Sequence, residues 1–255
     1  MSTATTEKSM AGQSRSSFAR IPAAFRLQFV VKTTFVTVPL IVFFGAWAVA
    51  IGIALWLHRL PAGPFTAEDP FHAGASQAAL WCLVFMAAYA ASHTFPFAMA
   101  LSFSRRVYVI GAFLAFAAVS AVYGLAFALA ALVERATDGY GIHAYTFDLP
   151  FLTDSAGIAG AGVLAAALCL LLMLFGFCVV ILYRRLGLAG TWAVLLGVVV
   201  LLVVAAMLIT TNEGWSQVWR WFGDQTTLTL SLWTLPAIGL LGAASYAMIR
   251  RAVPA

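Results

Sequence analysis

The sequence predicts an all-α integral membrane protein with six transmembrane helices and both termini in the cytoplasm. Three observations lead to this fold class: an apolar composition, six uncharged runs of spanning length, and basic residues concentrated in alternate connections. Residues 1–17 are polar and rich in Ser and Thr, so we expect a disordered cytoplasmic tail. Residues 18–251 are then expected to form a single transmembrane domain.

Composition excludes a soluble fold. Hydrophobic residues make up 63% of the 255 residues and charged residues only 9%, and the mean hydropathy is +0.98. Soluble domains carry about a quarter charged residues. The net charge of +5 could indicate nucleic-acid binding, but the basic residues cluster where membrane orientation would place them, so no nucleic-acid partner is expected. The three cysteines lie in apolar runs and are expected to be packing residues, without a disulfide framework or metal site.

Each of the six uncharged runs exceeds the roughly 20 residues that a helix needs to cross a bilayer. They are Thr33–Leu57, Pro70–Ser104, Val107–Val133, Ser155–Tyr183, Leu186–Asn212 and Gln225–Ile249. Several are longer than one crossing requires, so we expect their ends to be tilted, interfacial or non-helical.

The distribution of basic residues predicts the orientation. With both termini inside, the cytoplasmic segments hold eleven of the fourteen Lys and Arg residues, and only Arg59, Arg135 and Arg220 fall outside. An excess of Lys and Arg in short cytoplasmic connections fixes the topology of membrane proteins. The third run gives the same direction, because Arg105 and Arg106 precede it and Glu134 follows it.

Phe18–Lys32 has Phe18, Ile21, Phe25 and Phe29 near one face of a helix. This pattern predicts an amphipathic helix along the inner membrane surface, beginning near Pro22. The alternative is an ordinary basic flank that orients the first span.

A second flanking element is expected before the last span. Trp215, Trp219 and Phe222 recur at helical spacing within residues 212–227. Aromatic side chains of this kind prefer the membrane interface. We expect a short outer interfacial helix here, and an aromatic anchor without further role is the alternative.

The chain carries no recognisable catalytic motif. Walker, G-x-S-x-G and H-E-x-x-H patterns are absent from the sequence, so no catalytic residue and no metal site is predicted. His93 lies within the second run, where it could be a haem ligand, a proton relay or a packing residue. A b-type haem needs axial ligands on facing helices, and the other three histidines are expected in outer connections.

Four short motifs carry a resemblance to a known family. They are FSRRVY at 103–108, LVERAT at 132–137, GYG at 139–141 and YRRLG at 183–187. Together with the layout of an amphipathic lead-in, six spans and an outer element before the sixth, they resemble membrane permease subunits of ABC transporters, the ABC-2-type exporter group.

The resemblance implies a division of labour. The permease carries no cofactor, and a separate ATP-binding subunit binds ATP and Mg²⁺ and hydrolyses the nucleotide. Two permeases, either two copies or one copy and a paralogue, form the pore in the cell membrane. The inner turn after the second span docks on the ATPase, and here it corresponds to Ser104, Arg105, Arg106 and Tyr108.

Within that turn, the two arginines would pair with acidic groups of the ATPase or with lipid phosphates, and Tyr108 would pack. A positive-inside anchor is the competing interpretation of Arg105 and Arg106, and the two are compatible.

The uncharged spans favour an apolar or amphipathic substrate. A hydroxyl-lined path between subunits would use Ser120, Tyr123 and Thr191. A membrane protein outside the ABC group, such as a haem-binding redox subunit or an assembly or immunity protein, is the alternative function.

Overall fold

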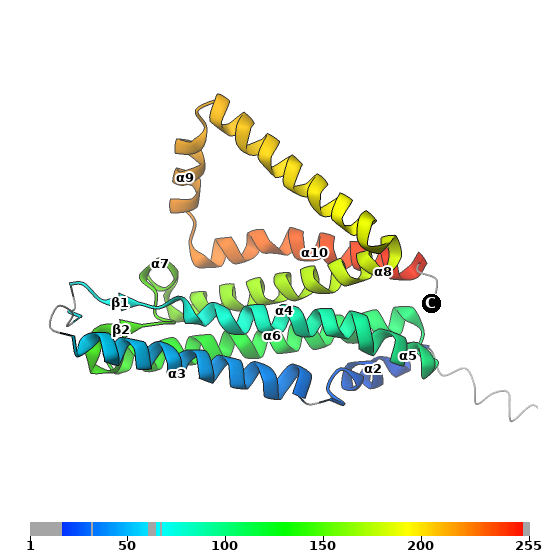
Figure 1. Ribbon diagram of the computed structural model, residues 1–255, viewed down its shortest axis with the longest axis horizontal. Coiled ribbons are helices and arrows are strands. Elements are labelled where there is room, and N and C mark those ends of the chain that lie inside the picture. The colour runs from blue at the N-terminus through cyan, green and yellow to red at the C-terminus, as the bar shows by residue number, and fades with distance from the viewer. Residues whose placement is uncertain (1–16, 32, 61–64, 67, 252–255) are drawn as a thin grey trace, which may run out of the picture.

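The structure, a computed structural model, describes residues 17–31, 33–60, 65–66 and 68–251. Helices lying side by side form most of it (Figure 1). Within the described residues, five helices are long and apolar enough to cross a membrane, which confirms an all-α fold of membrane type. Of the tail expected at 1–17, residues 1–16 lie outside the described part of the chain.

The expected N-terminal helix is present and packs against the bundle. A 3-10 turn (Ser17–Arg20) leads into α2 (Ile21–Leu27), whose first turn holds Pro22. Proline is tolerated there because its missing N–H would have no partner in the first turn. Ala24 of α2 lies so close to Gly111 that a Cβ on this glycine would come within 2.6 Å of the Ala24 Cβ. Contact with α6 therefore holds α2 in place.

The next two runs differ in regularity. A π-helical turn (Thr33–Thr37) precedes the straight helix α3 (Val38–His58). The second run is helical only in part, as its length suggested. It contains strand β1 (Phe71–His72), a 3-10 turn (Gly74–Ser76), α4 (Gln77–Tyr89), a π-helical turn (Ala90–Thr94) and α5 (Phe95–Ala100).

Helices α6 (Arg105–Ala136) and α8 (Gly157–Thr211) form the central pair of the bundle. They cross at Gly124 and Gly162, where a Cβ on Gly124 would lie 2.4 Å from the Gly162 carbonyl oxygen. Small residues allow this approach of two backbones. Helices α4 and α10 (Thr227–Arg251) pack along α8, and α2 packs along α6.

The connection expected between the fourth and fifth runs is a sharp bend at Gly187. Helix continues through Arg184 and Arg185, and the non-helical residue Gly187 then divides the 55 residues of α8 into two helical halves, one for each run. Gly187 has φ 69° and ψ −175°, a conformation essentially restricted to glycine. The Tyr183–Leu186 stretch favours a helix because its residues are helix formers, and only the glycine changes direction.

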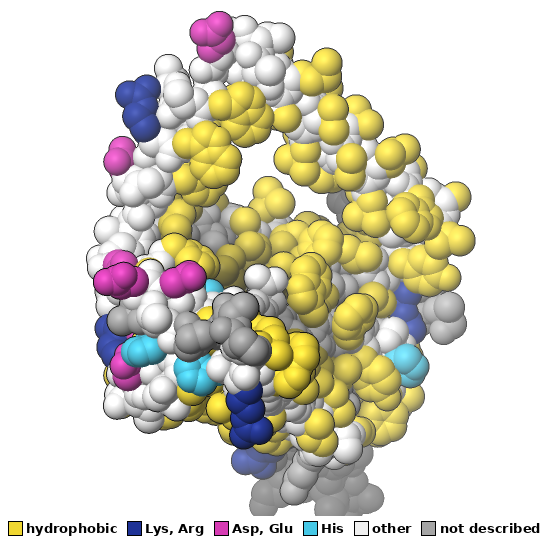
Figure 2. Space-filling model, turned by 60° about the vertical axis from the view of Figure 1, so that its left-hand side comes forward, with side chains coloured by type: hydrophobic (Ala, Val, Ile, Leu, Met, Phe, Trp, Pro, Cys, Tyr) yellow, Lys and Arg dark blue, Asp and Glu magenta, His cyan; other side chains and the backbone are white. Residues whose placement is uncertain are grey.

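Beyond the bend, the second half of α8 and helix α9 (Trp215–Gly223) form an arm that stands away from the bundle (Figure 1). α10 then returns along the first half of α8. Figure 2 shows the opening between arm and bundle, flanked by hydrophobic side chains. The side chains of the arm are largely apolar and exposed: Leu201 and Trp219 are each 68% exposed. The predicted helix with the tryptophan stripe is thus confirmed as a helix.

Charged residues divide between two ends of the bundle. We call one the basic end; it lies on the N-terminal 3-10 turn, α2, α6, α8 and α10 and holds Arg20, Arg26, Arg105, Arg106, Arg184, Arg185 and Arg250. The other, the acidic end, holds β1, β2 (Ala144–Tyr145), α7 (Pro150–Thr153) and α9 (Figure 1). Every Asp and Glu among the described residues lies toward the acidic end.

A buried carboxylate organises the acidic end. Glu134 is fully buried, and its Oε2 accepts hydrogen bonds from the backbone N–H groups of Thr146 (2.9 Å), Phe147 (2.7 Å) and Asp148 (3.0 Å). Its Oε1 accepts from the Tyr140 hydroxyl at 3.2 Å. Four donors compensate the cost of removing this charge from water. The last turn of α6 therefore fixes the path of the loop that follows it.

Two further contacts close this cap. Arg135 donates to both carboxylate oxygens of Asp148, at 2.8 and 2.6 Å. Partial burial opposes ionisation of Asp148, but the hydrogen bonds and charge of Arg135 outweigh it, so the pKa of Asp148 lies below its usual value. The Trp47 indole N–H of α3 donates to the Tyr140 hydroxyl at 2.7 Å, which ties α3 to the cap.

We expect Gly124→Ala to destabilise the bundle by about 1–3 kcal/mol, because the new methyl group overlaps the Gly162 backbone. Gly45→Ala is the matched control, since a Cβ there meets no atom within 4 Å. Unfolding of the purified protein in detergent, followed by circular dichroism, measures both. Equal midpoints for the two variants would contradict the close crossing.

Glu134→Gln should lower the free energy of unfolding by about 2 kcal/mol, because an amide offers one acceptor oxygen where the carboxylate offers two. Glu68→Gln, at an exposed position of the same end, serves as the control and should change little. Thermal unfolding in detergent, followed by tryptophan fluorescence, is the measurement. A loss in the control as large as that in the Glu134 variant would count against the cap.

The Arg135–Asp148 pair predicts an acid-sensitive cap. Because the pKa of Asp148 is lowered by folding, its contribution is complete at neutral pH and is lost as the pH falls from about 4 through the folded-state pKa. Asp148→Asn should lower the unfolding midpoint at pH 7 and remove this part of the acid dependence. Identical pH profiles for variant and wild type would refute the assignment.

Candidate functional site: the basic end and an apolar groove

Arginine side chains hold the basic end together through carbonyl groups. Arg20 donates to the Ser102 carbonyl oxygen at 3.0 Å and stacks over the Phe103 ring at 4.3 Å, which joins α2 to the turn between α5 and α6. Arg184 of α8 donates to the carbonyl oxygen of Ser92 in the π-helical turn. These contacts tie segments that lie about 80 to 90 residues apart in the chain. They do not neutralise charge, because the acceptors are neutral.

The predicted coupling residues begin α6. Ser104 is the N-cap of this helix, and its hydroxyl accepts from the Val107 N–H at 3.3 Å. Arg106 Nε donates to the Tyr246 hydroxyl at 2.9 Å, and Arg105 reaches the Ile249 carbonyl oxygen at 3.4 Å. The turn is thereby connected to the last turns of α10.

Tyr108 differs from the other three. Its side chain is fully buried, and its hydroxyl donates to the Ala90 carbonyl oxygen at 2.8 Å. It therefore supports the turn from inside the bundle, next to the π-helical segment, and presents nothing to a partner.

A cavity of about 300 Å³ lies where α6 begins and α10 ends. It is lined by Arg105, Arg106, Tyr246, Ile249 and Arg250. No ion pair among the described residues involves these arginines. The basic end therefore presents positive charge that is suited to carboxylates or phosphates.

His93 lies in the π-helical turn of the second run. Its ring stacks on Tyr89 with centroids 4.3 Å apart, and its Nδ1 lies 2.7 Å from the Ser92 hydroxyl. His58 and His143 lie toward the opposite end of the bundle, in α3 and in the cap. Among the described residues, no group of three metal-ligating side chains comes together.

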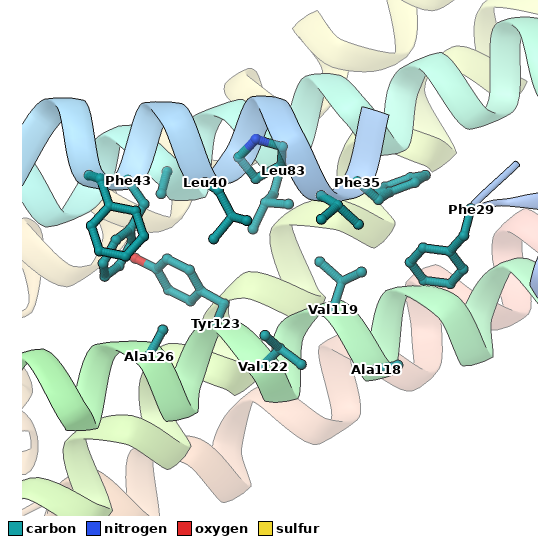
Figure 3. A pocket seen from close by; sticks show the side chains of 14 residues that line it. Phe29, Phe35, Leu40, Phe43, Leu83, Ala118, Val119, Val122, Tyr123 and Ala126 are labelled. Atoms are coloured by element: carbon teal, nitrogen blue, oxygen red, sulfur yellow. The ribbon is translucent and has the colours of Figure 1, made fainter. Parts of the chain in front are cut away.

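An apolar groove runs between α3 and α6, with α4 as its floor (Figure 3). It encloses about 250 Å³. Its principal lining residues are Phe35, Leu40 and Phe43 of the first span, Leu83 of α4, and Val122 and Tyr123 of α6. The Phe43 and Tyr123 rings meet at one end, with centroids 6.2 Å apart, and Phe29 closes the other (Figure 3).

The three hydroxyl groups expected to line a path do not share one surface. Only Tyr123 lines the groove, and its hydroxyl donates to the Ser76 carbonyl oxygen at 2.8 Å. Ser120 donates to the Ala117 carbonyl and Thr191 to the Gly187 carbonyl, each within its own helix. All three side chains are buried, and each hydroxyl donates to a backbone carbonyl oxygen.

The groove was not predicted from the sequence. Its walls come from residues about 80 positions apart, and each wall alone is an ordinary uncharged span. The one available signal was Phe29, which belonged to the predicted amphipathic stripe, followed by Phe35 at the start of the first run.

No family model matches the chain, and neither the curated proteins nor the solved structures contain a match.

Proposed function

We propose that the chain is the membrane-spanning subunit of an ATP-driven exporter for a hydrophobic or amphipathic substrate. A separate ATP-binding subunit would supply the hydrolysis, and a second permease would complete the pore. The observation that carries the proposal is the basic end: α2, the start of α6, the bend of α8 and the end of α10 converge there without a carboxylate among the described residues.

A six-span topology fits this architecture. Residues 157–186 and 188–211 of α8 span about 45 and 36 Å at 1.5 Å per residue, so each half is long enough to cross the roughly 30 Å core of a bilayer. If the bend at Gly187 lies at the inner surface, the two halves of α8 cross separately and the arm becomes the fifth span. The basic end then faces the cytoplasm of the cell, in accord with the positive-inside tendency, and α9 lies at the outer interface.

The contacts of the basic end provide a route by which movement of a docked ATPase would be transmitted to the helices. An ATPase pushing on Arg105 and Arg106 would act on α6 directly and on α10 through Tyr246 and Ile249. Gly187, at the base of the arm, is a residue about which the arm could rotate relative to the bundle. The apolar arm would meet the second permease or lipid.

We expect a soluble partner with a Walker loop to copurify with the chain from its native host in mild detergent. Arg105→Glu/Arg106→Glu should reduce the recovered partner at least tenfold, because it reverses the charge of the docking turn. Arg59→Glu/Arg220→Glu, the same charge change at the acidic end, is the matched control and should retain it. Mass spectrometry of the eluate identifies and quantifies the partner.

Thermal unfolding of both double variants shows whether they remain folded, and Arg105→Gln/Arg106→Gln gives a milder second test. Purification of the wild-type chain without an ATPase, or with a haem Soret band, would overturn the proposal in favour of a protein outside the ABC group.

A further inference from the structure

We propose that the groove between α3 and α6 binds the distal part of one acyl chain of a membrane lipid. The proposal concerns a lipid site within a single copy of the chain and does not depend on transport.

The chemistry of the walls selects a hydrocarbon. Every lining side chain except Tyr123 is apolar, and the Tyr123 hydroxyl is already committed to the Ser76 carbonyl oxygen. A polar ligand would therefore lose its hydrogen bonds with water and gain none in the groove. Apolar cavities of this size stay dry and accept apolar ligands.

The shape and opening select a chain. The α6 wall extends from Ala118 to Ala126, about 12 Å along the helix axis, so the groove is elongated in the direction of the spans. Leu40, Phe44 and Val122 on its rim are 50%, 55% and 66% exposed. The groove is thus open on a side where the exposed residues are apolar, the kind of surface that lipid hydrocarbon covers.

The depth selects the distal part of the chain. Ala118 to Ala126 is the middle of α6, the longest unbent helix among the described residues. For a helix that crosses the membrane, this level corresponds to the bilayer centre, where acyl chains end. Bulk lipid is as apolar as the groove, so transfer from lipid adds little to the binding free energy. Binding is instead favoured by the dispersion contacts that an unfilled groove would lack.

The test uses the purified full chain in phosphatidylcholine vesicles that contain a phospholipid with a diazirine near the end of one acyl chain. After irradiation, peptide mass spectrometry locates the adducts. We expect adducts on Leu40 and Val122 at least fivefold more often than on Leu201 of the arm, which is more exposed than either of them. Uniform labelling of all exposed apolar residues would overturn the proposal.

Two matched pairs of variants sharpen the result. Leu40→Trp covers the opening, whereas Ile41→Trp lies next to it on α3 and points away from the groove. Ala118→Phe fills the groove, whereas Ala121→Phe, one turn away on α6, does not. Adducts on the remaining groove residues should fall at least fivefold in the first member of each pair only.

Because two independent substitutions block the site, misfolding of one leaves the other as a test. Equal labelling within both pairs would refute a chain bound in the groove. The measurement needs no ATPase, so loss of the lipid site and failure of the transporter proposal are separate results.

Discussion

The close crossing of α6 and α8 at Gly124 and Gly162 is the contact on which the rest of the bundle depends. Association of helices in lipid gains little from the hydrophobic effect, because lipid tails are as apolar as the side chains. Backbones that approach closely instead gain dispersion contacts along their length. α4, α10 and α2 then pack on the two faces of this pair. The position of each later feature, from the cap to the basic end, follows from this central pair.

The two ends of the bundle use charge in opposite ways. At the acidic end, the carboxylates of Glu134 and Asp148 are hydrogen-bonded within the protein, to backbone N–H groups and to Arg135 respectively. At the basic end, Arg20 and Arg106 bond to neutral oxygens and keep their charge available. A carboxylate that receives several donors rigidifies its surroundings, whereas unneutralised arginines attract acidic groups. One end is therefore closed by internal hydrogen bonds and an ion pair, whereas the other keeps positive charge without a carboxylate beside it among the described residues.

Two departures from regular helix give the molecule its asymmetry. The π-helical turn at residues 90–94 exposes a carbonyl group at Ser92, and Arg184 of α8 binds it close to the bend at Gly187. π-helical turns occur frequently at functional sites. The hydrogen bond from Arg184 to Ser92 thus fixes the helix just before the arm begins at Gly187, whereas the arm itself stays exposed. The groove on the other side of the bundle lies in regular helices and does not share this anchor.

Several features of the fold could be predicted from the sequence because they depend on local properties. Uncharged runs longer than 20 residues predict spans, Pro22 marks the start of α2, and the tryptophan spacing of residues 215–222 predicts the helix that is observed. The separation of basic from acidic residues also follows from the order of the chain. These predictions succeed because hydrocarbon excludes charge and because proline and aromatic spacing act within one helical turn.

The sequence by itself determined the helical class, the apolar spans and the charge of each connection. Only the tertiary structure decided the burial of Glu134, whose three backbone donors lie 12 to 14 residues further along the chain. It likewise decided how sharply the chain bends at Gly187, and it formed the groove between α3 and α6. It also decided the surroundings of Ser120 and Thr191, because helix rotation and neighbours determine which surface a side chain faces; both hydroxyls bond within their own helix.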